Sequence, residues 1–348
     1  MKVLVTGGAG FIGSNFVHHL LRDHPADEVM VVDRLTYAGN LRNLGEALQD
    51  SRCRFIRLDI CDPAVRDVVK GCDAVVHFAA ESHVDRSIEE ASPFLHTNVE
   101  GTWRMVDACR AGHVPRFVHV STDEVYGSLG AQGKFTESSP LDPTSPYAAS
   151  KAASDLFVLS AVKTHGFPAL VTRCTNNYGP FQFPEKFVPL MIAQALAGLP
   201  LPVYGDGRNV RDWIHVQDHC QAIDLILRKG KEGEVYNIGG ECELENIAVA
   251  RKILKALQHS ESLLKFVTDR PAHDRRYALD CAKLKTELGW SPAWDFERGL
   301  QETIRWYQAN TSWLEEVRSG EYQRYFERHY LRREETFAGS GQASARLE

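Results

Sequence analysis

The chain has 348 residues, 43% of them hydrophobic, and its formal net charge is −6, from 40 Lys and Arg against 46 Asp and Glu. This size allows a large buried core in one big domain or two coupled lobes. The acidic balance argues against a nucleic-acid partner, and no apolar run approaches the roughly 20 residues of a membrane span.

The eight cysteines are scattered singly along the chain, and none forms a CxxC pair or a zinc-like cluster. We therefore expect reduced, mostly buried thiols and no metal site. The N-terminal residues enter an apolar strand at once, which leaves no room for a targeting segment. This start favours a cytoplasmic protein.

Short apolar runs alternate with helix-like segments through the first half of the chain. The runs lie at residues 2–6, 28–33, 54–58, 74–79, 116–121 and 168–174. Strands that are apolar throughout and alternate with helices are typical of a parallel sheet covered on both faces. The pattern predicts a doubly wound parallel α/β sheet of the Rossmann type.

The pattern changes after about residue 178, where Pro and Gly become frequent. A later helix-like stretch followed by EVYNIGG indicates a return to the main sheet. We expect an NAD-binding domain at 1–178 with 215–241, a smaller, discontinuous C-terminal substrate lobe at 179–214 and 242–330, and a mobile tail at 331–348.

A glycine-rich turn follows the first strand, with Gly7, Gly10 and Gly13 opening a helix. Such glycines let the backbone approach a pyrophosphate, which the free N–H groups of the helix can bind. Any glycine-rich turn shares this spacing, but here Asp33 ends the second strand, where a carboxylate binds the adenosine ribose. That carboxylate repels a 2′-phosphate and favours NAD over NADP, although the neighbouring Arg34 is a group that accepts such a phosphate.

Tyr147 and Lys151 are four residues apart in a helix-like segment, so they share one face. Such pairs also occur by chance, but after a dinucleotide motif a catalytic role is favoured. An ammonium beside a phenol is expected to lower the pKa of the tyrosine, which would make Tyr147 a base for a sugar hydroxyl. Thr122, just after the strand at 116–121, would complete a hydroxyl network with the phenol.

Asp123 and Glu124 directly follow Thr122. Elimination of water needs an acid and a base close together in opposite protonation states, and repulsion between adjacent carboxyl groups raises one pKa. Asp-Glu pairs at strand ends are commonly solvated or cap a helix. Because Asp123 and Glu124 lie upstream of Tyr147 and Lys151, we favour the catalytic role for this pair.

Long segments of the chain resemble the dTDP-glucose 4,6-dehydratases of the extended short-chain dehydrogenase/reductase superfamily. The resemblance covers about residues 1–330 and rests on motifs such as TGGAGFIGS (6–14), FAAESHVDRSI (78–88), STDEVYG (121–127), SPYAASK (145–151), RCTNNYGPFQFPEKF (173–187) and YGDGRNVRDWIHVQDH (204–219). It implies that bound NAD oxidises C4 of dTDP-glucose, that water leaves across C5 and C6, and that hydride returns to C6. It also implies a role in deoxysugar biosynthesis and a homodimer that pairs helices near 98–112 and 147–165.

The resemblance implies three sets of site residues. The catalytic set is Thr122, Asp123, Glu124, Tyr147 and Lys151, with Glu124 as the base at C5 and Asp123 as the acid at C6. The NAD set is Gly7, Gly10, Phe11, Ile12, Gly13, Asp33, Arg34, Leu35, Thr36, Asp59, Ile60, Ala79, Ala80, Ser82, Thr97, Tyr147, Lys151 and Asn177. The substrate set is Ser82, Thr122, Asn176, Lys186, Phe187, Pro202, Val203, Tyr204, Arg211, Asn246, Arg270 and His273.

One departure is Ala272, where the family commonly has Gly; if this position needs a positive φ, Ala strains the loop. Three alternatives stay open: a UDP-sugar 4,6-dehydratase, a nucleotide-sugar C4 epimerase and a non-catalytic NAD-sensing protein. Asp123 and Glu124 argue against the epimerase, which needs no acid and base at C5 and C6. His83 and Asp85 stay outside the catalytic set, because packing explains them equally well.

Overall fold

The computed structural model describes residues 1–271, 273–318 and 321–326. The expectations for the loop at Ala272 and for a tail at 331–348 lie outside these residues. Within them, no helix is long and apolar enough to cross a membrane. All eight cysteines are free, five of them buried and three half-buried, so the expectation of mostly buried thiols is confirmed.

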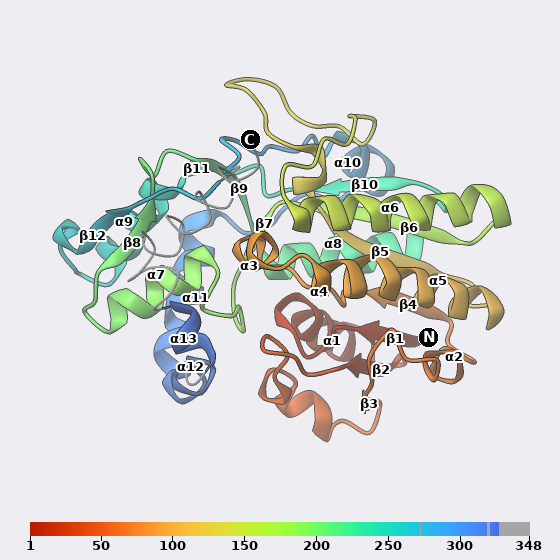
Figure 1. Ribbon diagram of the computed structural model, residues 1–348. Helices are drawn as coiled ribbons and strands as arrows, with labels where there is room; N and C mark the ends of the chain where they lie inside the picture. The colour runs from red at the N-terminus through yellow and green to blue at the C-terminus, as the bar shows by residue number, and fades with distance from the viewer. Residues whose placement is uncertain (272, 319–320, 327–348) are drawn as a thin grey trace, which may run out of the picture.

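Seven parallel strands form the main sheet, in the order β10-β6-β5-β4-β1-β2-β3 (Figure 1). They are β1 (Lys2–Thr6), β2 (Glu28–Asp33), β3 (Cys53–Arg57), β4 (Ala74–His77), β5 (Phe117–Thr122), β6 (Ala169–Cys174) and β10 (Val235–Ile238). The predicted parallel α/β sheet is confirmed, and the observed strands end within two residues of the predicted ones. β10 pairs with β6 in parallel, so the stretch EVYNIGG does return to the main sheet.

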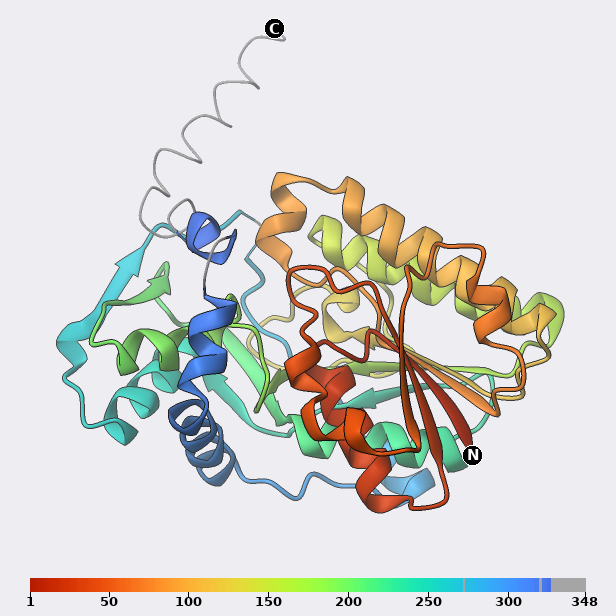
Figure 2. The same cartoon turned by 90° about the horizontal axis from the view of Figure 1, so that it is seen from below.

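Helices cover both faces of this sheet (Figures 1 and 2). On one face lie α1 (Phe11–Asp23), α8 (Val216–Lys229) and α10 (Ala282–Leu288), and on the other α2 (Val65–Val68), α5 (Thr102–Ala111) and α6 (Pro146–His165). Successive side chains of a strand point to opposite faces. Val3 and Val5 therefore pack under α1 and α8, while Leu4 packs in the opposite core.

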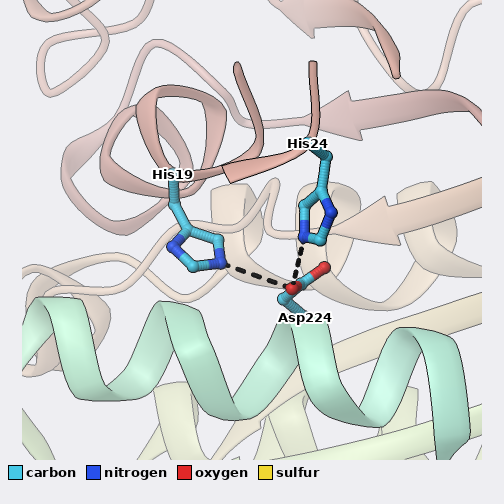
Figure 3. A group of neighbouring side chains, drawn as sticks. All are labelled: His19, His24 and Asp224. Atoms are coloured by element: carbon cyan, nitrogen blue, oxygen red, sulfur yellow. Dashed lines mark hydrogen bonds and ion pairs between the residues drawn. The ribbon is translucent and has the colours of Figure 1, made fainter. Parts of the chain in front are cut away.

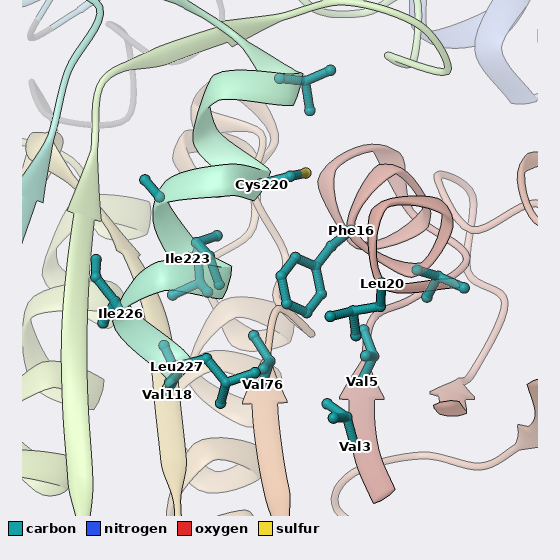
Figure 4. Close-up of a cluster of buried hydrophobic side chains, with 14 of the residues drawn as sticks. Val3, Val5, Phe16, Leu20, Val76, Val118, Cys220, Ile223, Ile226 and Leu227 are labelled. Carbon is teal, nitrogen blue, oxygen red and sulfur yellow. The ribbon is translucent and has the colours of Figure 1, made fainter. Parts of the chain in front are cut away.

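The core under α1 and α8 ties these two helices to the strands (Figure 4). Phe16 of α1 and Ile223 of α8 approach each other above Val76 and Val118 of the sheet. Phe16 and Ile223 are fully buried. Each such side chain contributes about 1.5–3 kcal/mol through burial. This core fixes α1, and with it the glycine-rich turn at its start.

The rest of the chain forms a second body beside the sheet (Figures 1 and 2). It contains the sheets β11-β9-β7 and β12-β8, with β7 (Asn176–Tyr178), β8 (Leu201–Tyr204), β9 (Val210–His215), β11 (Glu243–Glu245) and β12 (Leu264–Val267). Its helices are α7 (Phe187–Leu196), α9 (Asn246–Ala256), α11 (Phe296–Ala309), α12 (Thr311–Val317) and α13 (Glu321–Phe326). Met191, Ile253 and Tyr307 belong to its separate core.

Shorter elements connect the strands: α3 (Val84–Glu89), α4 (Ser92–Phe94), and the turns η1 (Leu41–Asn43), η2 (Gly45–Gln49), η4 (Asp123–Tyr126) and η5 (Glu261–Leu263). The helix expected near 98–112 is composite, because a π-helical segment, η3 (Leu95–Gly101), precedes α5. A Cβ on Gly101 would lie 2.5 Å from Cδ1 of Ile60, so glycine permits this close packing.

Candidate active site

A cleft opens at the carboxyl ends of β1, β2, β4, β5 and β6, where parallel sheets bind nucleotides. A second hollow reaches from it into the second body. Glu124, Asn176, Glu185 and Lys186 line both spaces, so the two form one continuous site.

The glycine-rich turn forms the floor of the cleft. Gly7 has φ +68°, and a Cβ there would lie 2.6 Å from the backbone nitrogen of Ala79. A Cβ on Gly13 would collide with the carbonyl of Gly7. Gly10 stands at the N-cap of α1, and no side chain of the described residues caps this helix. The first N–H groups of α1 therefore point into the cleft without a side-chain acceptor, which fits a pyrophosphate.

Asp33 ends β2 beside this turn. Its carboxylate accepts the N–H of Ala9 at 3.0 Å and the N–H of Leu35 at 2.8 Å. Burial raises the pKa of Asp33, and these two N–H donors partly offset that effect. Nη1 of Arg34 lies 2.7 Å from Oδ2 of Asp59, so this guanidinium is already paired with a carboxylate. A buried carboxylate and a paired arginine fit NAD better than NADP.

Most of the expected NAD set lines this one cleft: Gly7, Gly10, Phe11, Ile12, Gly13, Asp33, Arg34, Thr36, Asp59, Ile60, Ala79, Ala80, Ser82, Thr97, Tyr147, Lys151 and Asn177. Leu35 is the exception. Its backbone is left-handed, with φ 59°, and its side chain packs against the core under α1. Its N–H orients Asp33, so Leu35 serves the cleft through its backbone and not its side chain.

The ammonium of Lys151 is buried beneath β5. It donates a 2.8 Å hydrogen bond to the carbonyl oxygen of Val120, and burial lowers its pKa to about 8. Tyr147 shows the opposite of the expected shift. Its pKa is raised well above the usual value, first by burial and then by the charge of Glu124, while a hydrogen bond with Thr122 works to lower it.

The prediction that Lys151 lowers the pKa of Tyr147 is therefore wrong for the chain by itself. The physical reason is that the two side chains point in different directions. The ammonium faces a backbone carbonyl, whereas the phenol faces the carboxyl groups that follow β5. The expected pairing of Thr122 with Tyr147 is present. The helix start is well fixed, because Oγ of Ser145 accepts the N–H of Ala148 at 3.1 Å.

Asp123 and Glu124 lie in η4, directly after β5. Asp123 is 2% exposed; its Oδ1 accepts the Thr122 hydroxyl at 3.3 Å, and its Oδ2 accepts no hydrogen bond from the described residues. Burial, and then the charge of Glu124, raise the pKa of Asp123 well above its usual value.

The carboxyl group of Glu124 has different surroundings. Burial raises its pKa as well, but Arg270, Lys186 and Arg211 all act to lower it. The pKa of Asp123 is thus raised more strongly than that of Glu124, so Asp123 is better suited to keep a proton and Glu124 to lose one. Two adjacent carboxyl groups held in opposite protonation states can act as an acid and a base.

Three cations surround the second hollow. Lys186 donates to the carbonyl of Ser82 at 2.5 Å, and Arg211 donates to the carbonyl of Asp274 at 2.9 Å. Nη1 of Arg270 lies 3.6 Å from Oδ1 of Asp85. Burial lowers the pKa of Lys186 and of Arg211, because each charge is only partly compensated. Such a group, with Arg211 buried and Lys186 and Arg270 half-buried, suits a diphosphate.

Most of the expected substrate set lies along the two spaces. Ser82, Thr122, Asn176 and Lys186 line the main cleft, and the second hollow is lined by Asn176, Lys186, Phe187, Pro202, Tyr204, Arg211, Asn246, Arg270 and His273. Val203 does not line either space. It lies on β8 between Pro202 and Tyr204, and strand alternation turns its fully buried side chain into the second core.

Several residues line the site without having been singled out from the sequence: Cys174, Thr175, Gln182, Phe183, Glu185 and Tyr277. Glu185 pairs with Arg86 at 3.0 Å, and the ring of Tyr277 stacks under Arg211. From the sequence, Glu185 could have been found as the neighbour of Lys186, which belongs to the expected substrate set. His83 and Asp85 also line the second hollow, and Asp85 accepts the Tyr204 hydroxyl at 2.9 Å.

The chain is similar to known nucleotide-sugar enzymes along most of its length. Residues 4–303 match the family described as GDP-mannose 4,6 dehydratase. A dTDP-glucose 4,6-dehydratase of Actinoplanes sp. is 53% identical over 319 residues, which are 90% of this chain and 99% of that protein. Another, of Neisseria meningitidis serogroup B, is 49% identical and covers 92% of this chain and 97% of its own length.

Solved structures agree with these sequence matches. The dTDP-glucose 4,6-dehydratase DesIV of Streptomyces venezuelae, solved with NAD bound, superposes with a TM-score of 0.89 at 52% identity, covering 91% of this chain and 100% of that one. A UDP-glucuronic acid 4-epimerase of Bacillus cereus, also solved with NAD, gives 0.84 at 29% identity, covering 89% and 99%. The dehydratases are thus much closer in sequence than the epimerase, and the chain belongs to the dTDP-glucose 4,6-dehydratase family.

Proposed function

We propose that this chain is an NAD-dependent dTDP-glucose 4,6-dehydratase that forms dTDP-4-keto-6-deoxyglucose for deoxysugar biosynthesis. The observation that carries the proposal is the contrast between Asp123 and Glu124 at the end of β5. Asp123 is buried and Glu124 half-buried, and only Glu124 has three cations acting on it. A C4 epimerase would need neither group.

NAD, when bound, accepts the hydride from C4 of the sugar and returns it at C6. The residues that would hold it are the first turn of α1, Asp33 at the end of β2, and Lys151 on α6. The cleft floor offers backbone N–H groups for its pyrophosphate, and Asp33 offers oxygens for its ribose.

Tyr147 receives the proton of the C4 hydroxyl. Because burial and Glu124 raise the pKa of this tyrosine, its ionised form needs hydrogen-bond donors and positive charge close by. In the chain by itself only the Thr122 hydroxyl works to lower the pKa of Tyr147. We propose that the Lys151 ammonium, one helical turn along α6, adds positive charge near the phenol once NAD and the sugar occupy the cleft. Thr122 also orients the C4 hydroxyl.

The elimination uses the two carboxyl groups together. The C4 ketone acidifies the hydrogen on C5, and ionised Glu124 removes it. Asp123, which keeps its proton, gives it to the C6 hydroxyl, and that oxygen leaves as water. Glu124 then holds the proton that returns to C5. Arg211, Arg270 and Lys186 bind the diphosphate and keep Glu124 ionised before this step.

We propose the same division of labour for the two bodies of the chain. Residues 1–178 with 215–241 hold NAD, and residues 179–214 with 242–330 hold the nucleotide sugar. Two elements cross these bounds in the fold, because α10 packs on the main sheet and β7 belongs to a sheet of the second body. The placement of the glycine-rich turn in the first set and of Arg211 and Arg270 in the second supports this division.

A homodimer through α5 and α6 is part of the proposal. Trp103 is 37% exposed, Leu156 58% and Phe157 42%, and the rings of Trp103 and Phe157 lie 5.8 Å apart. An apolar surface of this kind on two adjacent helices suits a second copy of the chain. Sedimentation of the purified protein tests it: Phe157→Glu should shift the dimer to monomer, and a monomeric wild type would contradict it.

The activity is tested with purified protein, dTDP-glucose and no added NAD. The expected product is a 4-keto-6-deoxy sugar nucleotide, detected by its alkali-induced absorbance and by a mass lower by one water. UDP-glucose in a parallel reaction should turn over far more slowly. Formation of dTDP-galactose would show an epimerase.

A further inference from the structure

Three side chains far from the active site converge between α1 and α8 (Figure 3). His19 lies on α1, His24 follows its C-terminal end, and Asp224 lies on α8, 200 positions after His24. Nε2 of His24 and Nε2 of His19 lie 2.7 Å and 3.4 Å from the same oxygen, Oδ2 of Asp224. The three atoms all lie within 4.8 Å of one another.

One of these atoms has no hydrogen bond. His19 is 6% exposed, and its Nε2 makes no hydrogen bond to any described residue, although it points at the Asp224 carboxylate. Its nearest partner is the Asp224 oxygen at 3.4 Å, a long contact for a buried ring nitrogen, and a bound ion would satisfy this nitrogen better. Two imidazoles and one carboxylate aimed at a common point are the ligand types that zinc uses.

We propose that His19, His24 and Asp224 bind one divalent transition-metal ion of the zinc type. Zinc bonds to imidazole nitrogen and carboxylate oxygen are about 2.0–2.2 Å long, so two ligand atoms of a tetrahedron lie about 3.3 Å apart. The His19–Asp224 separation already has this value. His24 lies closer to Asp224 than this, at 2.7 Å, and its side chain is 26% exposed at the end of the helix, so it has room to move back. Water would fill the fourth position.

The residues around the three ligands suit this role. Nδ1 of His19 lies 3.1 Å from Oδ2 of Asp23 and 3.2 Å from Nη2 of Arg22. As an arginine only donates, Nδ1 accepts from Arg22 in this structure. A metal on Nε2 places the ring proton on Nδ1, so Nδ1 would release Arg22, which also donates to Asp23, and would itself donate to Asp23 as in the carboxylate–histidine–metal arrangement. Oδ1 of Asp224 accepts from Nε of Arg228 at 2.7 Å, which leaves Oδ2 for the ion.

The described residues hold one other group with donor atoms this close, Asp59, Cys61 and His96. Its donors are engaged: Asp59 pairs with Arg34, and Sγ of Cys61 donates to the carbonyl of His96 at 3.4 Å. Burial raises the pKa of the Cys61 thiol to about 12, so the thiolate that a metal needs is scarce. This group supplies a matched control for the first.

The ion would act on the fold and not on the dehydration. His19 and His24 belong to the end of α1, and Asp224 belongs to α8, so a shared ion ties together two helices that cover the same face of the sheet. Binding to the folded chain alone stabilises it by mass action. The sequence expectation of no metal site overlooked this group, because its members are single residues of ordinary helices.

The test uses the tag-free holoenzyme with its NAD, treated with a chelator and desalted. Titration with Zn²⁺ alone, followed by calorimetry and by Tm, should show one saturable equivalent and a Tm raised by several degrees. Both effects should disappear in His24→Gln and persist in the matched variant His96→Gln. Dehydratase activity should be the same with and without zinc.

Co²⁺ gives a second measurement that needs no variant. The wild type should show the visible bands of a tetrahedral ion without the near-ultraviolet band of a sulfur ligand. A wild type that binds no zinc, binding that persists in His24→Gln, or a cobalt–sulfur band that marks Cys61 as the ligand would each overturn the proposal.

Discussion

The ammonium of Lys151 donates a hydrogen bond of 2.8 Å to the carbonyl oxygen of Val120, near the end of strand β5. Burial lowers the pKa of this lysine to about 8, so its charge is lost just above neutral pH. The charge of Lys151, which we propose supports the ionised form of Tyr147 once NAD and the sugar are bound, therefore depends on pH within the range where the protein can be assayed.

Activity should fall as pH rises through about 8. The lowered pKa means that the ammonium is present below this pH and neutral above it, and C4 oxidation weakens when it is lost. Lys151→Arg keeps its charge at all these pH values. We expect the variant to be slower but to lack the decline near pH 8, as measured by rates of NADH formation in single turnovers. An unchanged decline in the arginine variant would exclude Lys151 as its source.

Glu124→Gln should stop the reaction after the first oxidation. An amide cannot take the C5 proton, so kcat should fall about 10²–10⁴-fold while NADH accumulates on the enzyme. Absorbance of the bound NADH after rapid mixing with dTDP-glucose measures this. Turnover at the wild-type rate would remove Glu124 from the base role.

Asp123→Asn should also slow the elimination, but for a different reason. The missing acid matters only while the leaving group needs a proton. A substrate with fluoride at C6 should therefore restore much of the rate of Asp123→Asn and little of that of Glu124→Gln. Release of fluoride measures the rate of each variant. Equal rescue of the two variants would show that the acid and base are not divided as we propose.

Tyr147→Phe should lose the first oxidation itself. The buried phenol is the group that faces Thr122, and removing its oxygen leaves the C4 hydroxyl without a proton acceptor. We expect kcat to fall at least about 10²–10³-fold, with no NADH formed on mixing, while the purified variant still contains NAD. Rapid NADH formation in this variant would contradict the assignment.

Phe16 offers a test of the packing that fixes the glycine-rich turn. It is fully buried between α1 and α8. Phe16→Ala should lower the free energy of unfolding by about 3–5 kcal/mol, measured by chemical denaturation. Phe266→Ala is the matched control, because this ring is 56% exposed and its loss should change stability by about 0.5 kcal/mol or less. Equal effects would mean that Phe16 is not a core residue.

Much of the site could be predicted from the sequence because parallel topology determines where motifs meet. Gly7 follows a strand, while Asp33 and Thr122 end theirs, and the carboxyl ends of parallel strands lie at one edge of a sheet. The parallel sheet is confirmed by the observed strand order. The comparisons support the dTDP-glucose dehydratase over the epimerase and UDP-sugar alternatives.

The predictions that differ from the structure concern the directions in which side chains point, which the spacing of residues in the sequence does not determine. Lys151 and Tyr147 share a helix face, yet the ammonium bends to Val120 while the phenol meets Glu124. Val203 is adjacent to two cleft residues, but a strand of period two turns it into the core. Leu35 adopts a positive φ that its residue type rarely takes.

The most direct test of the central claim follows the hydrogen from C4. The protein should convert dTDP-glucose that carries deuterium at C4 into a 4-keto-6-deoxy product with that deuterium at C6, located by NMR. This result requires oxidation, elimination and hydride return in one site. Deuterium found at C4 of an epimerised sugar, or lost to water without dehydration, would contradict the account.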